Sequence, residues 1–334
     1  MVKSFITNCQ NKKQMFQDFL TERKSKMTTP VDITVNLPGL AMKNPIMPAS
    51  GTFGYGDFAW CQSLDLNRLG ALVIKTTTLE EREGNPQPQI WVGDDFSINA
   101  VGLKNPGIDC VIKEKLPALK EKYPDLPIIG SVGGSTMEDY CRVAELFSQS
   151  GRVDALELNI SCPNVHEGGM AFGTDPKVAM ELTQKVKAVI DCPLYVKLTP
   201  NVTDVVSVAK AVEEGGADGL TLINTLFGMH IDVEKRQPVI ANVMGGVSGK
   251  PLKALAVRMV YQVRQATNLP IIGVGGIETV DDVIELFLAG ANAVQVGTAH
   301  FKNAEICDHL AQALPQRLHE LGFDRLDHLA QIFH

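Results

Sequence analysis

Eight short apolar runs recur between residues 44 and 299, and most are followed by a segment with helical periodicity. An apolar run without polar alternation indicates a strand that is buried on both faces, as in a parallel sheet. The intervening segments, such as 175–190 and 204–217, carry apolar residues at helical spacing. The runs are 44–50, 71–77, 127–134, 155–161, 193–200, 219–225, 270–276 and 293–299. Eight βα units in roughly 250 residues predict an α/β fold, the (β/α)8 TIM barrel.

Three segments lie outside this repeat. Residues 32–43 are predicted to form an N-terminal hairpin that plugs the amino-terminal end of the barrel. The long connections 82–106 and 226–250 are βα-loop insertions, and such loops lie on the face where barrel active sites form. A doubly wound open sheet is the alternative, but it expects G-x-G-x-x-G after the first strand, and residues 48–56 do not fit that motif.

Composition excludes several classes of function. The net charge of −7 predicts no nucleic-acid partner, and no apolar run approaches the roughly 20 residues that cross a membrane. The seven cysteines never form a C-x-x-C pair, so we predict no metal or iron–sulfur centre on this chain and a reducing, cytoplasmic location. Residues 1–27 carry six Lys or Arg against two acids and are interpreted as an N-terminal extension, or as an early start upstream of Met27. Residues 28–334 are the single barrel domain.

Polar residues and glycines stand where the predicted strands end. They are Ser50, Lys75, Ser131, Asn159, Lys197, Asn224, the pair Gly275–Gly276 and the pair Gly297–Thr298. One such residue can satisfy a turn. All of them converge on one rim of a barrel, which predicts a functional site there.

The two glycine pairs follow the seventh and eighth predicted strands, where backbone N–H groups of many barrels hold a phosphate. The string GVGGIE is not a dinucleotide fingerprint, because Glu278 occupies the place of the third glycine. The two turns together favour a phosphate, and a flat cofactor with one phosphate across the barrel mouth suggests FMN. Lys197 would offer a cation to the flavin edge that becomes negative on reduction. Because a buried lysine is costly, a carboxylate partner would supply a structural explanation for Lys197 instead.

Cys162 opens a glycine-rich loop directly after the fourth predicted strand, between Asn159 and Asn164. An isolated cysteine is usually a small buried hydrophobe, which is our interpretation of the other cysteines. A thiolate at the catalytic rim can instead act as a general base, and Gly168–Gly169 would let the loop move over a substrate.

These motifs resemble the class 1 dihydroorotate dehydrogenases over nearly everything after residue 30. The similar strings, in family order, are NPIMPASGTFGYG, KTTTLEEREGNPQP, INAVGLKNPG, ELNISCPNVHEGG, YVKLTPNVTD, INTLFGM, GGVSGKPLK, IIGVGGI and VGTA. The form NISCPNV followed by FGTDP resembles the NAD-linked class 1B catalytic subunit. Fumarate-linked class 1A enzymes have a Pro- and Lys-containing loop there, and class 2 enzymes place Ser at the position of Cys162.

The resemblance implies oxidation of dihydroorotate to orotate in pyrimidine biosynthesis, with Cys162 as the base. It implies a substrate site made by Lys75, Asn99, Val101, Gly102, Leu103, Asn159, Asn164, Asn224 and Thr225. It implies one FMN held by Ser50, Gly51, Lys75, Thr76, Ser131, Asn159, Lys197, Ile223, Gly249, Gly275, Gly276, Gly297 and Thr298. It also implies a partner subunit that carries FAD and a 2Fe–2S cluster, in a heterotetramer of two copies of each chain.

Three alternatives stay open at this point. One is a fumarate-linked dihydroorotate dehydrogenase that needs no partner, and another is an enzyme similar to dihydropyrimidine dehydrogenase. The third is a barrel that binds a phosphate ligand without catalysis.

The general-base interpretation of Cys162 predicts that Cys162→Ala slows flavin reduction by dihydroorotate by roughly 10²–10⁴-fold, the usual size of such an effect. Flavin and orotate binding should persist, and Cys162→Ser should lie between, because a hydroxyl is a poorer base near neutral pH. Anaerobic stopped-flow absorbance measures the rate. Wild-type rates in both variants would leave Cys162 as a structural thiol.

Overall fold

Eight parallel strands form the centre of the computed structural model, which describes residues 31–161 and 172–329. They are β3 (Ile46–Pro48), β4 (Leu72–Val73), β7 (Ile128–Val132), β8 (Ala155–Asn159), β9 (Leu194–Leu198), β10 (Gly219–Leu222), β15 (Ile271–Val274) and β16 (Ala293–Val296). Their order is β3-β16-β15-β10-β9-β8-β7-β4. The Gly70 N–H donates to the Ile46 carbonyl (2.9 Å) where β4 returns to β3. This nearly closed sheet confirms the predicted (β/α)8 barrel.

The strands are shorter than the apolar runs that predicted them. The run 71–77 contributes only Leu72–Val73 to a strand, and Thr77 makes a single further bridge to Val132. Beyond Val73 the chain keeps only separate hydrogen bonds to β7, from the Ile74 N–H to the Ile129 carbonyl (3.1 Å) and from the Thr77 N–H to the Ser131 carbonyl (2.9 Å). The ends of the runs therefore belong to the loops at the carboxyl ends of the strands.

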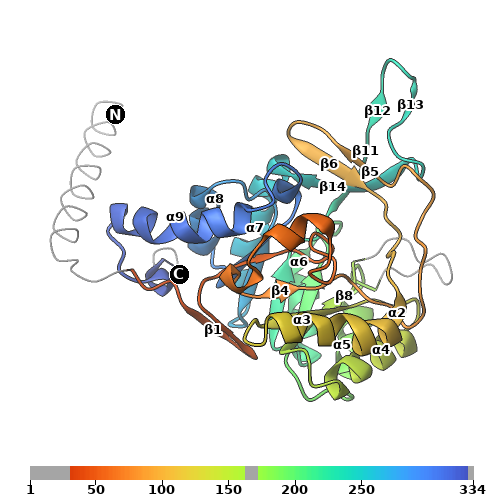
Figure 1. Ribbon diagram of the computed structural model, residues 1–334, viewed down its shortest axis with the longest axis horizontal. Helices are drawn as coiled ribbons and strands as arrows, with labels where there is room; N and C mark the ends of the chain where they lie inside the picture. The colour runs from red at the N-terminus through yellow and green to blue at the C-terminus, as the bar shows by residue number, and fades with distance from the viewer. Residues whose placement is uncertain (1–30, 162–171, 330–334) are drawn as a thin grey trace.

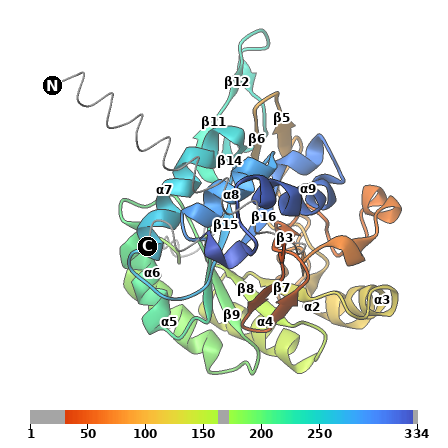
Figure 2. The same ribbon diagram turned by 90° about the vertical axis from the view of Figure 1, so that its left-hand side faces the viewer.

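Helices surround the strands, as Figures 1 and 2 show. They are α2 (Gly107–Cys110), a π-helical turn (Val111–Lys115), α3 (Leu116–Lys122), α4 (Met137–Gln149), α5 (Pro176–Lys187), α6 (Val205–Glu214), α7 (Lys253–Arg264), α8 (Val280–Leu288) and α9 (Ile306–Glu320). Capping boxes start α4 at Thr136 and α8 at Thr279. The first βα unit has 3₁₀ turns at Ala59–Ser63 and Leu66–Arg68 in place of an α-helix.

The predicted hairpin closes one end of the barrel. It consists of β1 (Val35–Leu37) and β2 (Leu40–Met42). Leu40 and Met42 are buried against side chains from the amino-terminal halves of the strands, among them Met47 and Ile129. The Tyr195 hydroxyl donates to the Pro38 carbonyl (2.9 Å) and fixes the turn of the hairpin.

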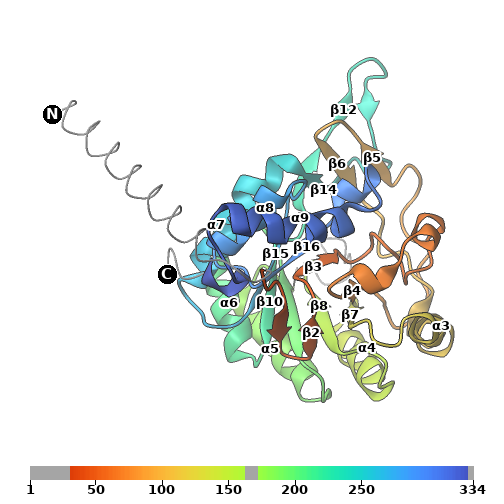
Figure 3. The same cartoon turned by 60° about the vertical axis from the view of Figure 1, so that its left-hand side comes forward.

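The two insertions pair with each other and form one antiparallel sheet beyond the barrel (Figures 1 and 3). Its strands are β5 (Ile90–Val92) and β6 (Phe96–Asn99) from the first insertion and β11 (Leu226–Met229) and β14 (Met244–Gly249) from the second, in the order β11-β14-β6-β5. A short hairpin, β12 (Ile231–Asp232) and β13 (Gln237–Pro238), projects from it. We call the four strands β11, β14, β6 and β5 the outer sheet.

Within residues 31–161 and 172–329, no helix has the length and apolar character needed to cross a membrane. The predicted extension, residues 1–27, lies outside the described residues.

Candidate active site

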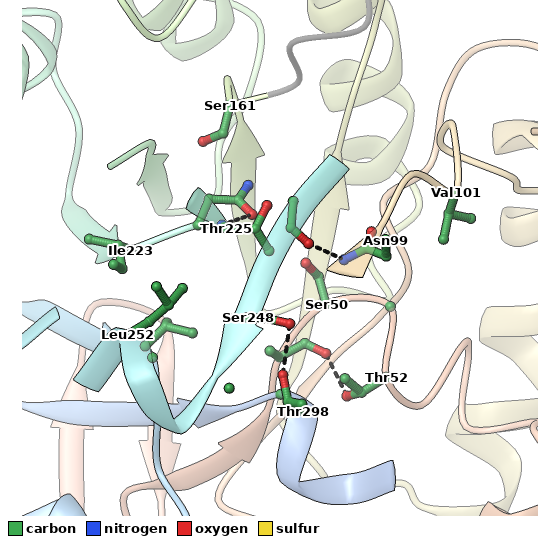
Figure 4. A pocket seen from close by; sticks show the side chains of 18 of the residues that line it. Ser50, Thr52, Asn99, Val101, Ser161, Ile223, Thr225, Ser248, Leu252 and Thr298 are labelled. Carbon is green, nitrogen blue, oxygen red and sulfur yellow. Dashed lines mark hydrogen bonds between the residues drawn. The ribbon is translucent and has the colours of Figure 1, made fainter. Parts of the chain in front are cut away.

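A cavity of about 340 Å³ opens between the carboxyl ends of the barrel strands and the outer sheet (Figure 4). Residues predicted for the site from widely separated parts of the sequence line it together. They are Ser50, Gly51, Lys75, Thr76, Asn99, Val101, Gly102, Leu103, Asn159, Lys197, Ile223, Asn224, Thr225, Gly249, Gly275, Gly276, Gly297 and Thr298. The position of the cavity is the one predicted from the strand ends.

Among the described residues, one predicted site residue, Ser131, is not part of this lining. Ser131 is fully buried, and its hydroxyl lies 2.9 Å from Thr76 Oγ1. Thr76 lines the cavity, and the contact predicted between Ser131 and the ligand stays a prediction. Cys162 and Asn164 lie outside the described residues.

Lys197 lies at the floor of the cavity and is only 4% exposed. Its Nζ is 3.5 Å from Ser50 Oγ and 3.2 Å from Gln295 Oε1. It also lies 3.5 Å from Oε1 of Glu157, which is fully buried. Glu157 is thus a carboxylate partner that supplies a structural explanation for the burial of Lys197.

A chain of side-chain hydrogen bonds orders the polar groups beside Lys197. Asn159 Nδ2 donates to Thr76 Oγ1 (3.3 Å), and Asn224 Nδ2 donates to Asn159 Oδ1 (3.2 Å). The Thr225 backbone N–H donates to Asn224 Oδ1 (2.8 Å). Each amide is thus held in one orientation while keeping one N–H free of these bonds, which suits reading a polar ring.

The outer sheet supplies one wall of the cavity. Its register aligns Ile90, Asn99, Gly246 and Phe227 in one row across four strands, and all four line the cavity. Asn99 Nδ2 donates to the Gly246 carbonyl (3.3 Å). A Cβ at Gly246 would lie 2.1 Å from Thr225 Oγ1, so glycine is required for this close approach.

Tight glycine turns form the opposite end of the cavity. Gly276 has a φ of +71°, and a Cβ there would lie 2.6 Å from the Lys253 backbone nitrogen. The N–H groups of Gly275 and Gly276 donate to no backbone acceptor of the described residues. At Gly297, a Cβ would contact only Ala49, at 3.8 Å, which leaves open space in the cavity. Free amides around such a space have the chemistry of a phosphate cradle.

A hydroxyl contact joins this end to the outer sheet. Thr298 Oγ1 donates to Ser248 Oγ (2.8 Å), drawn as a dashed line in Figure 4. Ser248 in turn lies 3.0 Å from Ser97 Oγ. The sheet and the end of the eighth barrel strand are thereby fixed relative to each other.

A buried histidine, His300, contacts the backbone of the Gly297 turn. His300 Nδ1 lies 3.0 Å from the Gly297 carbonyl, and Nε2 lies 3.4 Å from Cys307 Sγ. Burial lowers the pKa of His300 to about 4, so the ring is neutral at pH 7. A neutral ring that donates from Nδ1 to the carbonyl must accept at Nε2, and the Cys307 thiol, whose pKa burial raises, is the donor there.

Several residues of this region are not among those predicted from the sequence, namely Glu157, Gln295, Asn201, Ser161 and His300. Glu157 and Gln295 had a visible signal, because each is a polar residue inside an otherwise apolar run. Asn201 had no such signal, because its partners are distant in sequence. Its side chain donates to the Thr225 carbonyl (3.0 Å) and accepts from the Phe227 N–H (2.7 Å). Among the described residues, no three His, Cys, Asp or Glu side chains are grouped so that they could hold a metal.

The fold and the cavity define a (β/α)8 barrel with a polar ligand site at the carboxyl ends of its strands. Residues 32–318 match the family model described as dihydroorotate dehydrogenase. This chain belongs to the dihydroorotate dehydrogenase family, as the sequence motifs predicted.

Relatives with two different names are similar to this chain. Dihydroorotate dehydrogenase A (fumarate) of Lactobacillus helveticus is 57% identical over 299 residues, which cover 90% of this chain and 97% of that protein. Dihydroorotate dehydrogenase B (NAD(+)), catalytic subunit, of Enterococcus faecalis is 54% identical over 297 residues, covering 89% and 95%. The B-type catalytic subunit of Anoxybacillus flavithermus is 55% identical over 294 residues, covering 88% and 93%.

The burial of His300 predicts a pH dependence of stability. Its folded pKa of about 4 lies below the unfolded value near 6.5, so its contribution is complete above pH 6.5 and is lost as the pH falls toward 4. The loss should be on the order of 3 kcal/mol in the free energy of unfolding. His300→Asn keeps an N–H donor for Gly297 without titrating, so its stability should fall less steeply over this range.

Denaturant unfolding between pH 7 and pH 4 measures this difference in slope. His309→Asn is the matched control, because it removes an exposed histidine of α9 in place of a buried one. If the free energy of unfolding fell equally with pH in wild type and in His300→Asn, His300 would not contribute to the pH dependence of stability.

Proposed function

We propose that this chain oxidises dihydroorotate to orotate with one bound FMN, and that it is the catalytic subunit of an NAD-linked dihydroorotate dehydrogenase. The observation that carries the proposal is the convergence in one cavity of free glycine amides, the buried Lys197 and a chain of oriented asparagine amides. Each group alone has a structural explanation, but together they match the parts of a phosphate-bearing flavin and a polar pyrimidine.

The residues present fit FMN. Gly249, Gly275, Gly276, Gly297 and Thr298 would hold the phosphate with backbone amides and one hydroxyl, at the end of the cavity where a Cβ at Gly297 would meet open space. Lys197 Nζ lies 3.5 Å from Ser50 Oγ. Both groups would contact the edge of the ring at which reduced flavin gathers negative charge. Bound there, FMN would supply a hydride acceptor.

The remaining polar groups fit dihydroorotate. Asn99, Asn159 and Asn224 each present an amide to the cavity and would read the ring carbonyls and N–H groups, with Asn164 and Thr225. Lys75 would meet the carboxylate. Its Nζ lies 3.4 Å from the place of a Cβ at Gly51, so glycine leaves that ammonium group room at the cavity wall.

The reaction removes a hydride from C6 and a proton from C5, which leaves the C5=C6 double bond of orotate. We propose Cys162 as the base that takes the C5 proton. Its place in the sequence, three residues after Asn159, supports this role.

NAD as the final acceptor requires a second protein. The described residues contain no cluster-binding group, and the sequence has no dinucleotide fingerprint. We propose a partner subunit that carries FAD and a 2Fe–2S cluster, in a cytoplasmic heterotetramer of two copies of each chain. The loop sequence NISCPNV with FGTDP and the relatives named as B-type catalytic subunits support this choice.

Fumarate as the acceptor is the second candidate. The observation that favours it is the 57% identity to relatives named as fumarate-linked enzymes, slightly above the identity to the B-type subunits. In that case the chain would act without a partner.

The acceptor assay separates the two candidates. We expect the purified chain to reduce an artificial dye with dihydroorotate but to reduce neither NAD nor fumarate. Addition of an FAD- and iron–sulfur-bearing partner subunit should establish NAD reduction. Fumarate reduction by the chain alone at the rate of dye reduction would establish the second candidate, and NAD reduction by the chain alone would overturn the partner.

A further inference from the structure

A buried carboxylate lies inside the barrel directly beneath the cavity. Glu157 of β8 is fully buried and does not line the cavity, whereas Lys197 of the neighbouring strand β9 does. In the register of these strands Asn159 pairs with Lys197, so Glu157 is two residues below that pair and points to the same side of the sheet. Glu157 is therefore one layer deeper than the groups that line the cavity.

Gln295, from the far side of the barrel, links the two charged groups. Its Nε2 donates to Glu157 Oε2 (2.6 Å), and its Oε1 accepts from Lys197 Nζ (3.2 Å). The opposite orientation of the amide would set its oxygen against the carboxylate and its N–H groups against the ammonium. Only the orientation present satisfies both charges.

The second oxygen of Glu157 is directed at the lysine as well. Oε1 accepts no hydrogen bond from the described residues and lies 3.5 Å from Lys197 Nζ. A carboxylate removed from water is costly unless a charge or hydrogen bonds compensate it. Lys197 and Glu157 thus compensate each other's buried charge.

We propose that Glu157 is a positioning residue that acts through Lys197. Its carboxylate, with Gln295, fixes the ammonium at the floor of the cavity and offsets part of its positive charge, and so sets how strongly the site prefers reduced over oxidised flavin. This inference rests on the proposed FMN site.

The sign of the effect follows from the charges. Reduced flavin gathers negative charge at the edge that Lys197 would meet, and a cation there favours the reduced form. The negative charge of Glu157 lies behind that cation and weakens its field in the cavity. Removal of this charge should therefore make the flavin reduction potential more positive.

Spectroelectrochemical titration of Glu157→Gln, with the flavin content measured from the same spectra, tests this. Gln295→Met is the matched control, because it breaks the same network without changing charge. We expect a positive shift of the potential in Glu157→Gln and a smaller shift in Gln295→Met. An unchanged or more negative potential in Glu157→Gln, or an equal shift in both variants, would overturn the proposal.

A second measurement covers variants that lose flavin. Thermal unfolding of the full-length chain after flavin removal compares Glu157→Gln, Lys197→Met and the double variant. Each single variant leaves a buried charge or donor without its partner, so the double variant should have a higher Tm than the sum of the two losses predicts. Additive losses would overturn the pairing of Glu157 with Lys197. Failure of wild type to bind FMN would overturn the proposed function and, with it, the effect of Glu157 on the flavin, while the unfolding data would still report on the pairing.

Discussion

The parallel closure of eight strands is the constraint on which the rest of this structure depends. Because all strands run in one direction, all their carboxyl ends meet at one rim, and residues far apart in sequence become neighbours. Ser50, Asn159, Lys197 and Gly297 share a cavity for this reason. The same closure puts the two insertions on one face, where they can pair as the outer sheet.

The interior of the barrel changes character from one end to the other. At the amino-terminal end the hairpin residues Leu40 and Met42 fill the space with apolar side chains. Toward the cavity the interior becomes polar, with Glu157, Gln295 and Lys197 in mutual contact. Burial of the apolar end stabilises the fold. The polar layer above it would destabilise the fold if its buried charges were not paired with each other.

The sequence predicts the elements of this fold well, because apolar runs of strand length and helical periodicity are local signals. It predicts the position of the cavity, since the carboxyl ends of parallel strands must meet. It does not predict contacts across the barrel: Glu157 lies beneath Lys197 only because of the register of β8 and β9, and Gln295 joins them from β16. For the same reason the sequence does not predict the contact between the buried Ser131 hydroxyl and Thr76 Oγ1.

Loop conformation is the second part that local patterns could not provide. The sequence predicts the face on which the insertions lie. Their pairing into one sheet, with Asn99 bonded to Gly246, depends on contacts between segments distant in sequence. The role of His300 is hidden in a similar way. Only the fold shows that a histidine three residues after Gly297 turns back to bind its carbonyl.

The central claim is that this cavity binds FMN and lets dihydroorotate reduce it. The visible spectrum of the purified chain, recorded anaerobically with FMN supplied and then with dihydroorotate added, tests both parts at once. The account predicts a protein-bound flavin spectrum that bleaches when dihydroorotate is added. A chain that binds no flavin, or a bound flavin that dihydroorotate leaves oxidised, would contradict it.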